Sequence, residues 1–305
     1  MSVVTIERTE ALTHHERFNV LQRILHGTLM VAFLGLAATG MPLRFNQARW
    51  SIDFAAAIGG FDAILVLHKL LAVLLTLTFI VHLGYVSWMA FIKRKKGIFR
   101  GPTSMVPQLS DVRQLITHFK WFVGRGERPA FGRFTYWEKF DYLAVFWGMF
   151  AIGITGYVMW FSEAAARILP GWAFNVSLLI HSEEALLAVW YIFAIHFFNS
   201  HLRPGKFPMD TVIFTGRESL HELAVDRPSE YSRLVDAGVL EKAAVPPPPR
   251  WLKNFGHIIG TTAIVIGFAL FGFTVYAFVT EGNATEVVVP ADRVLVGPSI
   301  TPGGP

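Results

Sequence analysis

Cysteine is absent from the 305-residue sequence, and charged residues are scarce at 16%. Without cysteine the chain forms no disulfide, no thiolate-held iron–sulfur cluster, no covalent c-type haem and no cysteine zinc site. Its apolar stretches also hold none of the Glu-x-x-His motifs of di-iron bundles. With 53% hydrophobic residues and a mean hydropathy of +0.44, the chain is too apolar for an ordinary soluble domain. Eleven histidines remain as the main soft metal ligands.

Five apolar stretches are long enough to cross a hydrocarbon core, which takes about 20 helical residues. They are 19–42, 64–92, 140–162, 176–200 and 255–280. The first is too long for a signal peptide and contains Arg23 and His26, so we interpret it as an uncleaved span. The sequence therefore predicts an all-α integral membrane protein, with a transmembrane four-helix bundle plus a fifth transmembrane helix.

The basic residues are divided unevenly between the two sides of these spans. Segment 93–139 holds 11 of the 27 Lys and Arg residues and segment 201–253 holds 8, whereas the opposite-side segments hold only Arg44, Arg49, Arg167 and Arg293. Because basic loops stay in the cytoplasm, we expect a multi-pass protein of the bacterial inner membrane, with a cytoplasmic N-terminus and a periplasmic C-terminus. The net charge of +5 lies in loops, so we expect contact with membrane lipid and none with nucleic acid.

Two apolar stretches each carry a pair of histidines. His68 and His82 are 14 residues apart, and His181 and His196 are 15 apart. Four turns of α-helix take about 14.4 residues and about 21 Å, so each pair lies on one helix face at two depths. Ionisable side chains inside a bilayer are costly and usually functional. Imidazoles facing each other at two depths are what two stacked b-type haems need.

Depth indicates which histidines share an iron. His68 and His181 both lie four or five residues inside the outer ends of their spans, so we expect them to ligate the outer haem. His196 lies near the inner surface, and its partner is either His26 or His82. A third haem is an alternative if His201 also coordinates, although a position at the headgroup boundary is favoured for His201.

Other polar side chains near these depths are candidates for haem-propionate or quinone contacts, with snorkelling to the interface as the alternative: Arg23, Lys69, Asn199, Arg203 and His257. Glycines of the first and third spans give room for a macrocycle or, alternatively, for close helix packing: Gly27, Gly35, Gly40, Gly148, Gly153 and Gly156. The remaining histidines lie in polar segments and are expected to be solvated: His14, His15, His118 and His221.

Residues 17–220 resemble the cytochrome b (gamma) subunit of formate dehydrogenases and the related cytochrome b subunits of nickel–iron hydrogenases and thiosulfate reductases. The resemblance rests on the Arg-x-x-His of QRILHGTL, on LVLHKLLAV and on SLLIHSEEALLAVWYIFAIH. It implies axial ligation by His26, His68, His181 and His196. The family pattern spaces the last two closer to 14 residues apart, so their spacing of 15 predicts a local bulge or a shifted ring.

Two features depart from that pattern. His82 is additional, and it resembles the cytochrome b of quinol:cytochrome c complexes, in which two helices supply all four ligands. The segment FTGRESLHELAVDRPSEYSRLVDAGVLE resembles parts of cytochrome b proteins associated with multihaem c-type cytochromes. We therefore expect five parts: a cytoplasmic segment 1–18, a four-span di-haem cytochrome b domain 19–220, a cytoplasmic connector 221–254 with a stiff proline run, the fifth span 255–280, and a periplasmic tail 281–305.

A bis-histidine haem has both axial positions filled and is suited to one-electron transfer. We therefore expect a membrane-anchoring cytochrome b subunit of a respiratory oxidoreductase complex. Two b haems would connect a periplasmic iron–sulfur or multihaem c-type cytochrome subunit with menaquinone or ubiquinone. One alternative is a quinol-oxidising cytochrome b that feeds a periplasmic multihaem cytochrome. Another is a non-redox membrane anchor or transporter, although transporter spans are usually broken or repeated in inverted topology.

Overall fold

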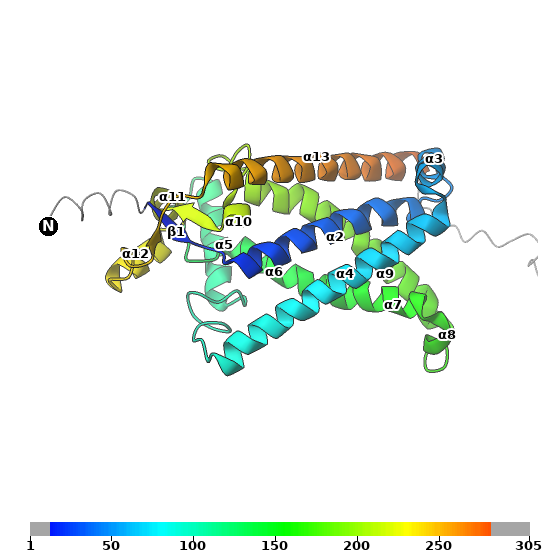
Figure 1. Ribbon diagram of the computed structural model, residues 1–305, viewed down its shortest axis with the longest axis horizontal. Helices are drawn as coiled ribbons and strands as arrows, with labels where there is room; N and C mark the ends of the chain where they lie inside the picture. Colours follow the sequence, from blue (N-terminus) through cyan, green and yellow to red (C-terminus); the bar gives the residue numbers. More distant parts are fainter. Residues whose placement is uncertain (1–12, 282–305) are drawn as a thin grey trace, which may run out of the picture.

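The computed structural model describes residues 13–281, and it consists of packed helices with very little strand (Figure 1). Five helices are long and apolar enough to span a membrane: Val20–Arg44, Phe61–Ile92, Tyr136–Trp160, Trp172–Leu202 and Arg250–Thr280. The predicted all-α membrane fold with five spans is confirmed, each span shifted by a few residues at its ends. The predicted tail 281–305 and most of segment 1–18 lie outside the described residues.

Three of the spans contain π-helical turns, in which the helix accommodates an extra residue. In chain order, the first span is α2 (Val20–Arg44), and the second is α4 (Phe61–Ser87) with η1 (Trp88–Ile92). The third consists of α6 (Tyr136–Gly148), η2 (Met149–Gly153) and α7 (Ile154–Trp160). The fourth consists of α9 (Trp172–Trp190), η3 (Tyr191–His196) and η4 (Phe198–Leu202), and the fifth is α13 (Arg250–Glu281).

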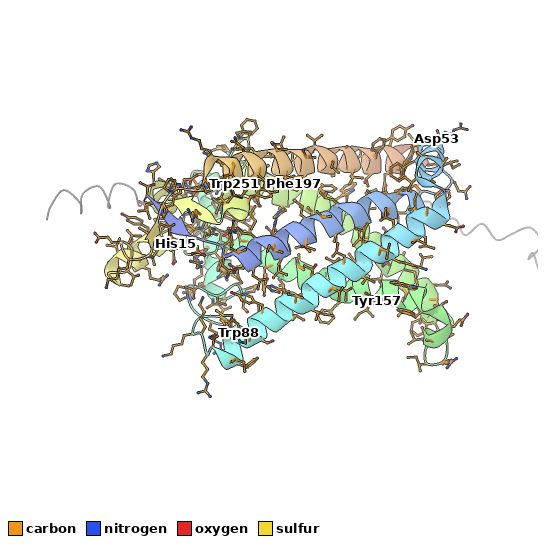
Figure 2. All side chains as sticks on the ribbon, viewed as in Figure 1. His15, Asp53, Trp88, Tyr157, Phe197 and Trp251 are labelled. Atoms are coloured by element: carbon orange, nitrogen blue, oxygen red, sulfur yellow. The ribbon has the colours of Figure 1, made fainter. Side chains whose placement is uncertain are left out.

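The connecting elements gather at the two ends of the bundle (Figure 1). One end, which we call the basic end, carries α5 (Leu109–Phe122), α10 (Val212–Thr215), α11 (Leu220–Asp226), α12 (Pro228–Asp236) and an antiparallel sheet in the order β2 (Arg217–Ser219), β1 (His14–Glu16), β3 (Ala244–Val245). The opposite end carries α3 (Arg49–Ile58) and α8 (Ser162–Ala165). Figure 2 places His15 and Trp88 at the basic end and Asp53 at the opposite end.

Capping boxes define where two spans begin at the basic end. The Asn19 side chain accepts from the Gln22 amide at the start of α2, and the Gln22 side chain accepts from the Asn19 amide in return. Thr135 and Glu138 form the same reciprocal pair at the start of α6. Because each box satisfies two helix donors that would otherwise lack partners, these helices begin at fixed residues beside the charged layer.

The core lies between α2, the fourth span and α13. Phe193 and Phe197 are buried there, and a side chain at Gly267 of α13 would collide with both rings. Small residues of this kind let membrane helices approach closely. Most other large apolar side chains of the spans face outward, as Leu70 does with 62% of its surface exposed. The fifth helix is therefore an integral part of the bundle.

A layer of buried ion pairs joins separate segments at the basic end. Arg17 before α2 and Arg227 before α12 both contact the Glu138 carboxylate, at 2.8 and 3.1 Å. Arg227 also pairs with Glu218 of β2, which is 1% exposed. Burial opposes the charge of Arg227, but the carboxylates of Glu138 and Glu218 outweigh it and raise the pKa of Arg227 above its ordinary value. These pairs hold the segment after the fourth span against the start of the third.

One expectation about the polar segments is wrong. His15 and His118 are each only 8% exposed instead of solvated, because the sheet and the aromatic side chains around α5 cover them. After the fourth span, the chain forms three helices and two strands before α13 begins. His221 is exposed, as predicted.

Replacing Arg227 tests the contribution of this ionic layer. The Arg227→Met variant leaves Glu218 buried without its closest cation, and removing one member of a buried pair costs about 3–5 kcal/mol. We expect a clear fall in the Tm of the purified protein in detergent. The control is Arg49→Met at the exposed Arg49–Asp53 pair, which should leave the Tm unchanged. Equal Tm values for both variants would contradict the assignment.

Candidate haem-binding site

One large cavity runs between the spans, with a volume of about 2000 Å³. Pockets for one small ligand are usually about 300–1,000 Å³, so this cavity has room for more than one group. Five histidines line it: His26, His68, His181, His196 and His201. Of the remaining predicted site residues, Lys69, Asn199 and Arg203 line the cavity, whereas Arg23, His82 and His257 do not.

His68 and His181 face each other toward the opposite end of the bundle. Their ring centroids are 6.2 Å apart, with the rings inclined at 70°. An imidazole nitrogen binds a metal ion at about 2 Å, so two rings sharing one ion have centroids about 6 Å apart. The spacing of this pair therefore fits the insertion of a haem iron between the two rings.

Hydrogen bonds fix the tautomer of both rings. The Ile152 carbonyl oxygen lies 2.9 Å from Nδ1 of His181 and can only accept, so Nδ1 carries the proton. The Thr39 hydroxyl donates to the Gly35 carbonyl at 2.7 Å, which leaves its oxygen to accept from Nδ1 of His68 at 2.8 Å. In both rings the Nε2 lone pair is then available, as metal-binding histidines require.

Two of the predicted glycines make room for the rings themselves. A Cβ at Gly40 would lie 3.3 Å from Cε1 of His68, and a Cβ at Gly156 would lie 2.9 Å from Cε1 of His181. Gly35 instead admits the Leu71 side chain, which is ordinary helix packing. An added Cβ at Gly27 meets nothing within 4 Å. The site therefore depends on glycine chiefly at positions 40 and 156.

A second group of imidazoles lies toward the basic end. His26 of α2 is within electrostatic range of His196 and His201 from the fourth span. Nδ1 of His196 donates to the Asp141 carboxylate at 2.9 Å, and the Tyr191 hydroxyl donates to the other oxygen of that carboxylate. A carboxylate on the far nitrogen orients a metal-binding imidazole and increases its basicity. Nε2 of His196 is thereby left for a ligand.

The bulge predicted from the 15-residue spacing of His181 and His196 is present. Segment η3 (Tyr191–His196) is π-helical and ends at the second histidine. A π-helical turn accommodates one residue more than an α-helical turn. The extra residue is therefore absorbed within the helix, and both histidines still line the same cavity.

His82 and His201 have different surroundings in the structure. Nε2 of His82 is 2.9 Å from the Tyr142 hydroxyl, and the ring packs edge-on against Phe146 outside the cavity. His201 is only 9% exposed and lines the cavity near His196, so it is enclosed by the protein. The structure thus brings His26 and His201, and not His82, to the inner part of the cavity.

The cationic side chains near the cavity already have partners. The Arg23 guanidinium donates to the backbone oxygens of Phe214 and Thr215. Arg203 donates to the Asn199 carbonyl at 2.9 Å and pairs with Asp226 at 3.4 Å. At the opposite end, the Lys69 ammonium lies 5.3 Å from the centre of the Trp160 ring. Lys69 and Arg203 line the cavity and present charge there.

Sequence reasoning missed Asp141, Tyr191 and Thr39, which orient the rings. Asp141 carried a usable signal, since it is a carboxylate at the start of an apolar stretch where charge is costly. Thr39 and Tyr191 carried none, because each is an ordinary residue in an apolar helix. Their roles depend on which helices are neighbours.

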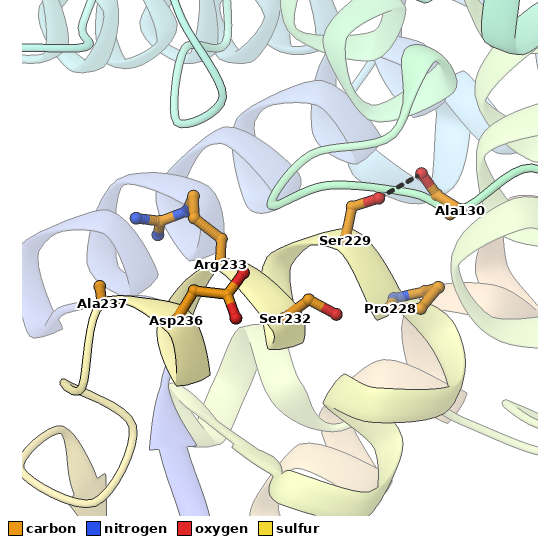
Figure 3. A pocket seen from close by; sticks show the side chains of 7 residues that line it. All are labelled: Ala130, Pro228, Ser229, Ser232, Arg233, Asp236 and Ala237. Carbon is orange, nitrogen blue, oxygen red and sulfur yellow. Dashed lines mark hydrogen bonds between the residues drawn. The ribbon is translucent and has the colours of Figure 1, made fainter.

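A second hollow lies at the basic end beside α12 (Figure 3). It contains no histidine, and two of its polar side chains are bonded within the protein. The Ser229 hydroxyl donates to the Ala130 carbonyl at 3.0 Å, and Arg233 pairs with Glu230. It offers no ligand for a haem iron.

An all-helical bundle that presents imidazoles from different spans at two levels of one cavity defines a membrane protein built to hold haem between helices. The sequence model for prokaryotic cytochrome b561 matches residues 17–200, and the chain belongs to this family. No curated protein matches the chain. The predicted resemblance to membrane cytochromes b is confirmed. The chain is a multi-pass prokaryotic membrane cytochrome b that carries b-type haem and transfers electrons.

Gly156 offers a direct test of the opposite-end histidine pair. We expect Gly156→Ala to displace the His181 ring and to lower the haem content per chain, measured as the pyridine haemochrome. Gly84→Ala is the matched control, because an added Cβ at Gly84 meets nothing within 4 Å. Full haem content in both variants would show that Gly156 is not needed for ligation.

Proposed function

We propose that this cytochrome b passes electrons through two bis-histidine b haems between a periplasmic redox subunit and membrane quinone. His68 and His181 hold the haem toward the opposite end, and His26 and His196 hold the haem toward the basic end. The observation that carries this proposal is the single cavity lined by both pairs, in which three of the four rings have Nδ1 hydrogen-bonded and Nε2 available.

The choice of His26 over His82 rests on position. His26 lines the cavity and lies within electrostatic range of His196, whereas Nε2 of His82 is engaged by Tyr142. His201 lines the same region and is proposed as a quinone contact, with ligation of a third haem as its alternative. Asn199 and Arg203 beside it supply polar atoms for a menaquinone or ubiquinone head group.

The orientation follows from charge. The basic end carries Lys93–Lys96 and most other basic residues, so we propose that it faces the cytoplasm of a bacterium. The opposite end, with α3 and α8, then faces the periplasm and the redox partner, an iron–sulfur or multihaem c-type subunit. The division at 19–220 into a di-haem domain, with 221–254 as a connector, stays a prediction.

Bound haem supplies reversible one-electron transfer, and two imidazole ligands keep dioxygen from its iron. The chain's residues set the conditions for that transfer. Thr39, Ile152 and Asp141 hold the protons of three ligand rings at Nδ1. The reverse current, from quinol to a periplasmic multihaem cytochrome, would use the same parts. Family membership excludes the non-redox anchor and the transporter.

Single replacements of His26 and His82 test the inner site and its link to quinone. We expect two haems per chain in the unmodified protein, one in His26→Leu, and two in His82→Leu, measured by pyridine haemochrome against protein mass. In vesicles, a menaquinol or ubiquinol analogue should reduce the unmodified protein and His82→Leu, and should reduce His26→Leu more slowly. Retention of both haems in His26→Leu, with loss of one in His82→Leu, would reverse the ligand assignment.

Replacing Asp141 tests the carboxylate on His196. The Asp141→Asn variant removes the negative charge beside Nδ1 of His196. This loss weakens the stabilisation of the ferric state. The midpoint potential of one haem should rise while the other stays constant, measured by redox titration of the α-bands. Asp53→Asn in α3 is the control, and it should leave both potentials unchanged. Unchanged potentials in Asp141→Asn would mean that the carboxylate does not act through the ligand.

A further inference from the structure

Helix α5 (Leu109–Phe122) has its polar side inward and its apolar side outward. Asp111 and His118 are among its buried residues. Large apolar side chains are exposed on the other side, with Leu109 at 82% and Phe119 at 61%, together with Val112, Ile116 and Val123 just after the helix. These fractions match those of outward-facing residues in the spans, such as Leu70 at 62%. A helix that faced only water would have the reverse arrangement.

The inward contacts fix the level of α5 in the bundle. Asp111 pairs with Lys139 at 2.8 Å, and both side chains are buried. One and a half to two turns further along, Nδ1 of His118 is 3.0 Å from the Tyr136 hydroxyl, and its ring stacks on Trp137. These partners all belong to the first turn of α6. Two points about 10 Å apart on α5 therefore meet one turn of the third span.

It follows that α5 lies across the end of the bundle instead of along it, at the level where the third span begins (Figure 1). That level is the boundary between headgroups and acyl chains, because α6 starts its apolar stretch there. Exposed tryptophans, which favour this boundary, occur at the same end: Trp88 and Trp251 (Figure 2).

The residues of α5 divide into three sectors at about 100° per residue. The inward sector contains Asp111 and His118. A second sector, about 80° wide on the same geometry, is wholly apolar: Leu109, Val112, Ile116, Phe119 and Val123. The third is polar: Ser110, Arg113, Thr117 and Lys120. A helix lying in a membrane surface presents an apolar and a cationic side in this way. The inward sector of α5 packs on protein.

The charge that precedes α5 matches the same surface. Lys93, Arg94, Lys95 and Lys96 are all exposed, and within residues 13–281 no carboxylate lies within ion-pair distance of them. Lys93 instead lies over the Trp88 ring, at 5.0 Å from its centre. Basic residues beside a span attract anionic headgroups.

We propose that α5 is an interfacial helix that lies in the lipid surface at the basic end, with its apolar sector in the acyl boundary and residues 93–96 on anionic headgroups. The occupant of the apolar sector is lipid, because that sector is level with the start of a span and follows an uncompensated basic run in the chain. This assignment does not depend on the number of haems or on the redox partner.

The absence of cysteine allows a clean test. Phe119→Cys in the apolar sector and Thr117→Cys in the polar sector are each labelled with a nitroxide in the full chain, reconstituted in phosphatidylcholine nanodiscs with or without phosphatidylglycerol. Power saturation then compares collisions with oxygen, which concentrates in lipid, and with a water-soluble nickel chelate. The haem spectrum of each labelled protein confirms that it is folded.

We expect the ratio of oxygen to nickel accessibility to be severalfold higher at position 119 than at 117. Phosphatidylglycerol should increase that ratio at 119, and replacing all four residues 93–96 with Gln should abolish the increase. Equal, high nickel accessibility at both positions would show that α5 faces water. An immobile label at 119, accessible to neither reagent, would show that a protein surface covers the apolar sector. No response to phosphatidylglycerol would overturn the headgroup assignment.

Discussion

A neutral imidazole inside this bundle carries one N–H group, and that group needs a hydrogen-bond acceptor from the protein because bulk water is absent. In a hydrocarbon environment an unsatisfied polar atom costs several kcal/mol. Three different acceptors serve the rings of the histidines that line the cavity: the hydroxyl of Thr39, the carbonyl of Ile152 and the carboxylate of Asp141. Each comes from a helix other than the one that carries the ring. The same bonds that stabilise the helix packing therefore leave Nε2 free toward the cavity.

The charged layer at the basic end serves the cavity indirectly. Capping boxes begin α2 and α6, and Glu138 belongs both to a cap and to the ion pairs of Arg17 and Arg227. Two segments distant in sequence, one before α2 and one after the fourth span, therefore hold the start of the third span. Asp141 lies less than one turn after that start. Rigid support of this kind keeps a ligand ring and its acceptor in register.

Hydrophobic length alone was sufficient to predict the five spans, because about 20 apolar residues have few alternatives. Periodicity found His68, His181 and His196, since their spacing is a property of single helices. Spacing and depth left the choice between His26 and His82 open, because it depends on how neighbouring helices are rotated about their own axes, and only the family resemblance favoured His26. The sequence shows Asp141 as a charge in an apolar stretch, but its partner, His196, is on another helix.

Tertiary contacts also explain the wrong expectations. His118 lies in a polar stretch, yet it is enclosed by aromatic rings that only folding brings together. The strands of the small sheet have two or three residues, too few to show a period of two. The bulge at η3 was one of two outcomes anticipated from comparing the histidine spacing with the family pattern, the other being a shifted ring.

The fifth helix has a consequence for biogenesis. Gly260, Ala263 and Ile264 of α13 form part of the cavity wall, and Gly267 packs directly on Phe193 and Phe197. Because α13 leaves the ribosome after the other four described spans, the cavity has an incomplete wall until it docks. Insertion of the fifth span is thus the step that completes this part of the wall.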